Sequence, residues 1–318
     1  MDILLIEPSS AQGCRRHGRW PVATAEHNAL HAKPTGRGRG GECRGAGVSW
    51  RYRVRSGPEA STPYSLPMAP TRFTGRHALV TGAASGIGRA TALRLASEGA
   101  GVMAVDVNAG ALEKLEVDSS GLGGAITALV GDVSSEAGVV ALVEASVAHL
   151  GGLDVVVNVA GVLSFSHTHE VNLDEWSRLI AVNLTGTFLV CRESLPHLLA
   201  SRGNIVNLAS TAAHKGQPWA TAYVASKGGV LALTRALAVE YAAQGVRANS
   251  ISPGAIDTPI TGAFHLPEGA DAKLLRRVTP LGPFGTPEGI AAAIAYVASD
   301  EAAHMNGADL LIDGATLA

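Results

Sequence analysis

His77-Ala-Leu-Val-Thr-Gly-Ala-Ala-Ser-Gly-Ile-Gly88 is a short apolar run that leads directly into a glycine-rich turn. Glycine has no Cβ, so the backbone of such a turn can approach a ligand closely, and the free amides of a following helix attract an anion. The spacing Gly82-x3-Gly86-x-Gly88 departs from the Gly-x-Gly-x-x-Gly pattern that is common at dinucleotide pyrophosphates. The turn therefore predicts either a phosphate site between a strand and a helix or a tight turn that only packs the helix against a sheet.

Strands and helices are expected to alternate from this turn onward. Short β-branched runs predict strands, and longer Ala- and Leu-rich stretches with helical spacing predict helices. The expected strands are His77–Thr81, Val102–Asp106, Ile126–Val130, Asp154–Asn158, Asn204–Leu208, Arg247–Ile251 and Leu310–Ile312, and the expected helices are 87–98, 135–150, 173–200, 222–244 and 287–299. This alternation predicts an α/β fold: a doubly wound parallel sheet of Rossmann type, with about seven strands, in one domain over residues 69–318.

Residues 1–68 differ in composition from the rest of the chain. Gly, Pro, Arg and Ser dominate, and stretches such as Gly36-Arg-Gly-Arg-Gly-Gly41 have no sustained helical period. We expect a disordered N-terminal extension, with Met68 as an alternative natural start. RNA binding by the short Arg/Gly stretch is a weaker hypothesis. A targeting peptide is disfavoured by three acidic residues, Glu7, Glu26 and Glu42.

Composition and charge exclude several classes of function. The net charge is −2 and no apolar run approaches the roughly 18 residues of a membrane span, so we expect neither a nucleic-acid nor a membrane partner. Three cysteines, Cys14, Cys43 and Cys191, show no disulfide or metal-ligand spacing. This cysteine usage favours a reducing, cytoplasmic setting. His167-x-His169 lacks a third ligand, so we expect two loop histidines and no metal.

Asp106 closes the second expected strand, twenty residues after Gly86. A carboxylate at this place can accept both hydroxyls of an adenosine ribose and repels a 2′-phosphate. The neighbouring positions that could carry a basic residue hold Ser85 and Val107-Asn108 instead. If the glycine turn binds a dinucleotide, these residues predict NAD in preference to NADP.

Tyr223-Val-Ala-Ser-Lys227 places a phenol and an amine one helical turn apart on the same face. An ammonium group near a phenol favours the phenolate and so lowers the tyrosine pKa, which makes Tyr223 a candidate acid/base. Taken alone the motif is weak, because incidental pairs on solvated helices are common. Ser210 lies thirteen residues upstream, after an expected strand. It is either a hydrogen-bond donor to a substrate oxygen or a simple strand-end cap.

In this order, the motifs resemble those of the short-chain dehydrogenase/reductase family over residues 73–318. The matching positions are Thr81–Gly88, Asp132-Val133, Asn158-Val-Ala-Gly161, Asn183, Ser210, Tyr223, Lys227 and Pro253-Gly254. Val159 stands where the family more often has a second Asn, which puts a local hydrogen bond in question. Residues 1–68 have no counterpart in the resemblance.

The resemblance implies an NAD-dependent alcohol dehydrogenase or carbonyl reductase. Tyr223 would exchange a proton with the substrate oxygen, Ser210 would hydrogen-bond that oxygen, Lys227 would also bond the nicotinamide ribose, and Asn183 would hold a water linking Lys227 to solvent. Asp132 and Val133 would touch the adenine, and Thr258 would lie near the nicotinamide amide. The implied cofactor-binding set is Gly82, Ser85, Gly86, Ile87, Gly88, Asp106, Asp132, Val133, Asn158, Ala160, Gly161, Tyr223, Lys227, Pro253, Gly254, Ile256 and Thr258.

Residues 259–285 form the least regular part of the expected domain and, by analogy with the family, a lobe that caps the substrate. Its apolar residues favour a hydrophobic secondary alcohol or ketone, although they could equally pack the lobe onto the core; they are Ile260, Phe264, Leu266, Leu274, Leu275 and Leu281. Two other functions stay open: a 3-oxoacyl-thioester reductase that uses NADPH, and a binder that senses a dinucleotide without turnover.

Two expected helices, 173–200 and 222–244, are apolar around much of their circumference. A helix of this kind has more apolar surface than one sheet face covers, so it needs a second partner. The resemblance implies that both helices pair with a second subunit and that the strand and tail at 310–318 form another interface, giving a homotetramer. Burial of each helix within its own subunit is the alternative.

Overall fold

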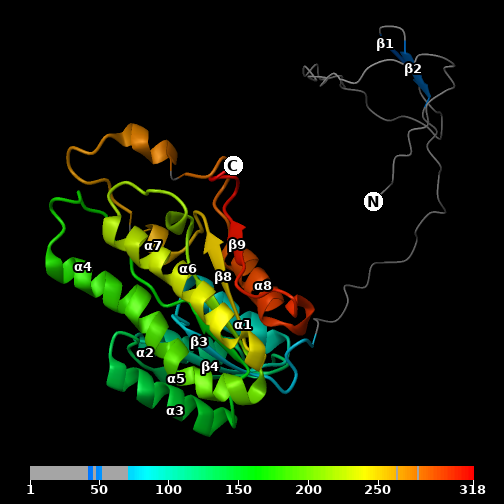
Figure 1. Ribbon diagram of the computed structural model, residues 1–318, viewed down its shortest axis with the longest axis vertical. Coiled ribbons are helices and arrows are strands. Elements are labelled where there is room, and N and C mark those ends of the chain that lie inside the picture. The colour runs from blue at the N-terminus through cyan, green and yellow to red at the C-terminus, as the bar shows by residue number, and fades with distance from the viewer. Residues whose placement is uncertain (1–41, 46–47, 52–70, 263, 278) are drawn as a thin grey trace. The chain divides into compact units, whose positions relative to one another are not determined.

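The computed structural model describes residues 42–45, 48–51, 71–262, 264–277 and 279–318 (Figure 1). The chain divides into two compact units, Met1–Leu66 and Pro67–Ala318. In the first unit, strand β1 (Glu42–Gly45) pairs antiparallel with β2 (Val48–Arg51), so that Glu42 lies opposite Arg51. Neither strand is predicted above. The expectation of disorder over residues 1–68 otherwise falls outside the described residues.

The second unit contains a seven-stranded parallel sheet in the order β5-β4-β3-β6-β7-β8-β9. The strands are β3 (His77–Thr81), β4 (Gly101–Asp106), β5 (Ala125–Val130), β6 (Val155–Asn158), β7 (Asn204–Leu208), β8 (Arg247–Pro253) and β9 (Asp309–Ile312). The predicted doubly wound fold is therefore confirmed. Strand order reverses between β3 and β6, and a crevice at the carboxyl ends of such strands is where open α/β sheets bind ligands.

Helices cover both faces of this sheet (Figure 1). The helices are α1 (Gly86–Ser97), α2 (Ala109–Asp118), α3 (Glu136–Leu150), α4 (Leu173–Ile180), α5 (Gly186–Ser201), α6 (Thr221–Tyr241), α7 (Pro259–Gly262) and α8 (Pro287–Ala298). One apolar core joins α1, α2 and α8 to the sheet, and the other joins α3, α5 and α6. Along β3, Val80 belongs to the first core and Leu79 to the second, because successive side chains of a strand point to opposite faces.

Two features of the helices differ from the sequence prediction. Helix α2 was not predicted; it buries only Leu112 and Leu115, so its apolar stripe is weak, and its clearest signal is the Asn108 side chain that caps it by accepting from Ala111 N. The single helix predicted over 173–200 is divided into α4 and α5 by a π-helical turn, Ala181–Thr185. Such turns insert one extra residue and are frequent at functional sites. No helix among the described residues is long and apolar enough to cross a bilayer.

Candidate active site

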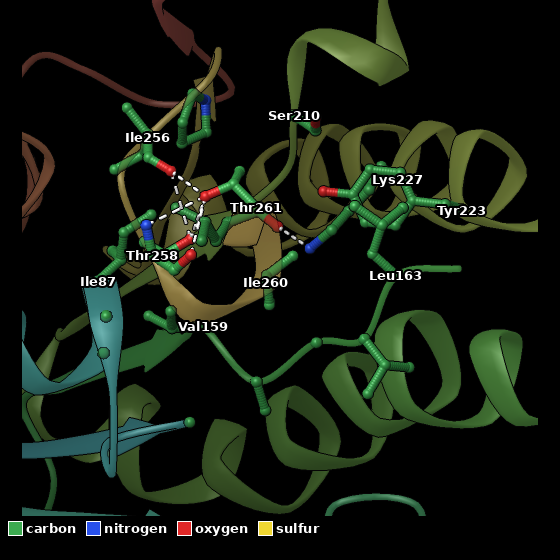
Figure 2. A pocket seen from close by; sticks show the side chains of 18 of the residues that line it. Ile87, Val159, Leu163, Ser210, Tyr223, Lys227, Ile256, Thr258, Ile260 and Thr261 are labelled. Carbon is green, nitrogen blue, oxygen red and sulfur yellow. Dashed lines mark hydrogen bonds between the residues drawn. The ribbon is translucent and has the colours of Figure 1, made fainter. Parts of the chain in front are cut away.

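A cavity of about 720 Å³ opens at the carboxyl ends of the central strands. It gathers nearly all the residues that the sequence singles out: Gly82, Ser85, Gly86, Ile87, Gly88, Asp106, Asp132, Val133, Ala160, Gly161, Ser210, Tyr223, Lys227, Pro253, Gly254, Ile256 and Thr258. Asn158 and Asn183 are not in its lining; both are buried behind the wall. Figure 2 shows Tyr223 and Lys227 projecting from one helix toward the segment that carries Thr258 and Ile260.

The glycine turn brings α1 to the edge of this cavity. A Cβ on Gly82 would lie 2.7 Å from the Ala160 amide nitrogen, so this glycine is required for the turn to pack against the end of β6. Gly86 has a φ of +48°, and a Cβ there would lie 3.1 Å from Thr258 Cγ2. Ser85, the residue before α1, makes no side-chain cap to the helix. The first-turn amides of α1 are therefore without a side-chain cap and fit the pyrophosphate of a dinucleotide.

Asp106 is fixed at the far side of the turn by two backbone amides. Its Oδ2 accepts from Ala84 N at 3.1 Å, and its Oδ1 accepts from Asn108 N at 3.0 Å. Each carboxylate oxygen keeps a second lone pair, and Asp106 lines the cavity, so a ribose diol bound there has an acceptor for its hydroxyls. Arg89 in α1 is occupied by Asp118, with Nη2 and Oδ2 2.5 Å apart. The geometry thus fits an adenosine ribose.

Asp132 and Val133 follow β5 and form the wall beyond Asp106. Asp132 Oδ1 accepts from the amide and the hydroxyl of Ser134, at 2.9 and 2.7 Å. Asp132 is therefore a turn residue that also lines the cavity. A Cβ on Gly186 would lie 2.9 Å from Val133 Cγ2, so the first residue of α5 must be small for the helix to approach this wall.

Asn158 lies under the cavity instead of in it. Its Nδ2 donates to Asn207 Oδ1 at 2.9 Å, and Asn207 Nδ2 donates to Thr234 Oγ1 of α6 at 2.9 Å. These bonds connect β6, β7 and the helix that carries Tyr223. Asn158 therefore belongs to a buried network behind the cavity wall, and its contact with a cofactor stays a prediction.

Lys227 is almost fully buried and its ammonium points at a backbone carbonyl. Nζ donates to Leu208 O at 2.6 Å and lies 5.9 Å from the centre of the Tyr223 ring. Burial lowers the pKa of Lys227 to about 8. The amine is therefore still mainly protonated at neutral pH, but its charge is held in a poorly solvated place.

Burial also has the largest effect on the pKa of Tyr223, contrary to the sequence-based expectation. It raises the pKa of the phenol above its ordinary value, and the hydrogen bond with Ser210 acts in the opposite direction without outweighing burial. The expected dominance of the Lys227 ammonium over the phenol pKa is thus wrong for the cofactor-free protein. The physical reason is desolvation, which disfavours the phenolate and cannot be read from the spacing of two residues.

The position of Ser210 agrees with both of the roles considered for it, a cap at a strand end and a residue of the site. It caps the 3₁₀ turn Thr211–Ala213, because its Oγ accepts from Ala212 N at 3.1 Å. It also lines the cavity and reaches the phenol of Tyr223. A hydroxyl that is oriented by a cap and faces a phenol is suited to bonding an oxygen placed between them.

Asn183 sits in the π-helical turn and organises the residues around it. Its Oδ1 accepts from Val162 N at 2.8 Å, and its Nδ2 donates to Val162 O at 2.9 Å and to Ser226 Oγ at 3.0 Å. Ser226 Oγ in turn donates to Tyr223 O at 2.7 Å. Sequence reasoning did not single out Val162 or Ser226. Only Ser226 has a sequence signal, its place three residues after Tyr223.

Gly161 separates Asn183 from Lys227. A Cβ on Gly161 would lie 3.3 Å from Asn183 Oδ1 and 3.6 Å from Lys227 Nζ. A side chain here would press on the amide and occupy the space beside the ammonium. The glycine thus keeps room next to Lys227, as a cofactor ribose or a water would need.

Large apolar side chains form part of the cavity lining. Ile260, Phe264 and Phe284 belong to the predicted lobe, although Phe284 was not singled out in it, and Leu163 and Phe165, which were not predicted, join them. Phe165 and Phe264 meet edge to face with ring centroids 4.6 Å apart, and His167 Nε2 lies 2.9 Å from Glu268 O. Both contacts tie the lobe to the loop after β6. Leu266, Leu274 and Leu281 are outside the lining and exposed, and the Leu275 side chain lies outside the described part.

His167 and His169 lie on this same loop, with ring centroids 5.7 Å apart. The His169 side chain is 80% exposed. Within the described ranges, no group of three or more His, Cys, Asp or Glu residues is placed to hold a metal ion.

The buried charge of Lys227 has a consequence for stability. Its folded pKa of about 8 lies below the ordinary value of 10.5, so the unfolded chain binds more protons between these pH values and stability rises with pH across that window. We expect Lys227→Met to raise the stability of the cofactor-free protein at pH 7 by about 2 kcal/mol, because removal of the buried charge outweighs the loss of the hydrogen bond to Leu208. The rise of stability between pH 8 and 10 should become flatter in this variant.

Thermal unfolding of both proteins from pH 7 to 10, without cofactor, measures this effect. Lys215→Met is the matched control, because that amine is less buried and bonds Thr316 O at 3.0 Å near the surface. A Lys227→Met protein that is less stable at pH 7 and keeps the wild-type slope contradicts the prediction.

Known proteins resemble this chain over most of the second unit. The family model described as "Enoyl-(Acyl carrier protein) reductase" matches residues 82–315. D-threitol dehydrogenase of Mycolicibacterium smegmatis is 43% identical over 76% of this chain and 93% of its own length. The 3-oxoacyl-[acyl-carrier-protein] reductase FabG of Thermotoga maritima is 40% identical over 76% of this chain and 98% of its own.

A solved structure agrees with these relatives. The short-chain type dehydrogenase/reductase of Mycobacterium marinum superposes with a TM-score of 0.71 at 32% identity, covering 78% of this chain and 97% of that one. Sequence similarity to these proteins thus extends over the part of the chain that contains the glycine turn and the cluster of Ser210, Tyr223 and Lys227. The chain belongs to the short-chain dehydrogenase/reductase family of oxidoreductases.

Proposed function

We propose that this protein is an NAD-preferring dehydrogenase/reductase that interconverts a hydrophobic secondary alcohol and its ketone. The observation that carries the proposal is the meeting of Ser210 with the Tyr223 phenol in the same cavity as the glycine turn and Lys227. A bound nicotinamide supplies or accepts the hydride. The chain's own residues then have to hold the substrate oxygen and move one proton.

Tyr223 is the proposed general acid and base. With its pKa raised by burial, the phenol is protonated at neutral pH, which is the form that donates to a ketone oxygen. In the direction of oxidation the phenolate accepts the hydroxyl proton. Ser210 donates a hydrogen bond to the substrate oxygen, and the Lys227 ammonium favours the phenolate and is a donor for a ribose hydroxyl once it leaves Leu208 O. Asn183 acts through Val162 and Ser226, and holds α6 in register with the loop after β6.

The preference for NAD is supported by Asp106. Its carboxylate is anchored by Ala84 N and Asn108 N, so it does not swing away from the position of a 2′-phosphate. A phosphate there would meet a fixed negative charge, whereas the two hydroxyls of an NAD ribose are donors that the carboxylate accepts.

A hydrophobic substrate is supported by five large apolar side chains of the cavity lining, which are Leu163, Phe165, Ile260, Phe264 and Phe284. The relative from M. smegmatis acts, by its name, on threitol, which is a polyol. The T. maritima relative acts, by its name, on an acyl-carrier thioester, and a 3-oxoacyl-thioester reductase is therefore the second candidate. A 3-oxoacyl-thioester reductase is expected to prefer NADPH, and Asp106 disfavours binding of that cofactor.

A panel assay decides between these substrates. Cyclohexanol, a 3-hydroxysteroid, threitol and a 3-hydroxyacyl thioester are each incubated with NAD or NADP, and nicotinamide absorbance is followed. We expect oxidation of the alicyclic alcohols with NAD at rates well above those of threitol. Fastest turnover of the thioester, with NADP, would establish the second candidate. If the protein binds NAD but neither oxidises any of these substrates nor reduces the matching ketones with NADH, it is a dinucleotide-sensing binder.

We further propose a homotetramer. Phe188 of α5 is 43% exposed and Val239 of α6 is 83% exposed, so each helix has an apolar outer side that its own subunit leaves uncovered. Light scattering at micromolar concentration is expected to give a mass near four times the 32.4 kDa of one chain. Val239→Arg should lower that mass, whereas Val117→Arg on α2, which is exposed to a similar degree, should not. A wild-type mass of one chain would contradict the assembly.

The cysteines support the proposed cytoplasmic setting. Cys191 is a free, fully buried thiol, and burial raises its pKa to about 12. Such a thiol is unreactive as a nucleophile and serves as a small core residue.

A further inference from the structure

Outside the cavity, a histidine in the loop that follows Ser210 contacts an aspartate of the last strand. His214 Nε2 lies 2.7 Å from Asp309 Oδ2 and 3.2 Å from Ser252 Oγ. Asp309 belongs to β9 and its side chain is 6% exposed. Its other oxygen, Oδ1, accepts from Ser250 Oγ at 2.5 Å and from Ser252 Oγ at 2.9 Å. Among the described residues, His214 is the histidine that contacts this nearly buried carboxylate.

His214 ends the same turn that Ser210 begins. The 3₁₀ turn Thr211–Ala213 is capped at its start by the Ser210 side chain, which accepts from Ala212 N. His214 is the residue that closes it, with its amide donating to Thr211 O at 3.0 Å. The turn contains three residues, so displacement at one end is transmitted to the other. The orientation of the Ser210 hydroxyl therefore depends on what holds His214.

Neither His214 nor Asp309 lines the cavity, so any effect on the reaction passes through other residues. The geometry gives two routes. One runs from Asp309 through His214 and the short turn to Ser210. The other runs through Ser252, which directly precedes Pro253 and Gly254 in the cavity wall. A single carboxylate on the last strand thus holds both the substrate-side turn and the end of β8.

A second bond ties the same loop to the C-terminal end of the chain. Lys215 Nζ donates to Thr316 O at 3.0 Å, and Lys215 lines the cavity. The loop from Ser210 to Tyr223 is therefore attached at adjacent residues, His214 and Lys215, to segments about a hundred residues later in the chain. The His214 bond differs from the Lys215 bond in that it reaches a carboxylate with little access to water.

We propose that His214 and Asp309 form a positioning pair that fixes the Ser210 hydroxyl against Tyr223 and thereby sets the turnover of the enzyme. The proposal deepens the proposed function and depends on it for the catalytic effect. His214 Nε2 carries the hydrogen in this arrangement, because it lies at hydrogen-bond distance from a carboxylate oxygen that can only accept. We expect loss of His214 to act on kcat, because its bond holds the turn that Ser210 begins, whereas Asp309 still holds Ser252 next to Pro253 and Gly254 when His214 is replaced.

Hydrogen exchange of the full-length protein tests the positioning itself. His214→Ala and Asp309→Asn should each speed the exchange of the amides of Ala213, His214 or its replacement, and Lys215 about tenfold. The control is His304→Ala, which removes an exposed histidine outside this cluster. Unchanged exchange in both variants overturns the proposal, whether or not the enzyme's substrate has been identified.

Kinetics test the consequence, with the panel alcohol that the unmodified protein oxidises fastest. His214→Ala should lower kcat about tenfold with the dissociation constant for NAD changed less than twofold, and His214→Gln should recover at least half of the loss, because Gln Nε2 can donate to Asp309. Equal impairment of the Ala and Gln variants, or a matching loss of NAD affinity, indicates a scaffold role and overturns the proposal. If no panel alcohol is oxidised, the proposed function fails and the exchange experiment alone decides the positioning.

Discussion

Tyr223→Phe is expected to lower turnover by about 100-fold or more while the protein stays folded and binds NAD. The substitution removes only the hydroxyl, and general acid–base catalysis by a positioned side chain typically contributes 10²- to 10⁴-fold. The ring remains on α6 against Leu163 and the rest of the apolar wall, so packing changes little. Steady-state rates with the best panel alcohol, together with NAD titration and thermal unfolding, measure each part of this expectation.

Two comparisons make the result specific. Tyr296→Phe removes a hydroxyl from a half-exposed tyrosine of α8 outside the cavity and should leave turnover unchanged. Ser210→Ala should lower turnover as well, since it removes the partner of the phenol and the cap of the turn. A folded Tyr223→Phe protein that oxidises the alcohol at nearly the wild-type rate would remove Tyr223 from the mechanism.

Strands were predicted better than helices, for a physical reason. The bounds of β3 and β7 agree with the sequence prediction residue by residue, because strands covered on both faces are short, apolar and bounded by polar or glycine-rich turns. Helix α2 has many charged residues and buries only two leucines, so its periodicity is weak. The π-helical turn at Asn183 depends on packing between elements and has no local signal.

The candidate site was predictable where it follows from motif order. Asp106, Ser210 and the glycine turn come together because the carboxyl ends of parallel strands share one edge of the sheet. Helix α6 then brings Tyr223 and Lys227 to the same cavity. Their partners were not predictable. Leu208 contributes a backbone carbonyl, and Asp309 lies 95 residues beyond His214, so neither contact leaves a pattern in the sequence. The direction of the Tyr223 pKa shift also required the fold, because burial outweighs spacing.

Asp106→Ser combined with Val107→Arg is expected to reverse the cofactor preference. Removing the carboxylate eliminates the repulsion of a 2′-phosphate, and Ser keeps a small polar group at the end of β4. Val107 is 66% exposed beside this position, so an arginine there can reach the phosphate without disturbing the core. A charge-assisted hydrogen bond contributes about 1.5–3 kcal/mol, which corresponds to about 10- to 100-fold in affinity.

The ratio of NADP to NAD affinity should therefore rise about 100-fold or more in the double variant, because the arginine gains its full effect only when the carboxylate is absent. Val107→Arg alone is the matched control: it adds the positive charge but keeps the Asp106 carboxylate, so we expect only a small gain in NADP binding. Titration of each protein with both cofactors measures the ratios. Thermal unfolding monitors the loss of the Ala84 and Asn108 bonds to Asp106, which is expected to cost about 1–3 kcal/mol. Equal affinities of the unmodified protein for NAD and NADP would show that the anchored carboxylate does not select the cofactor.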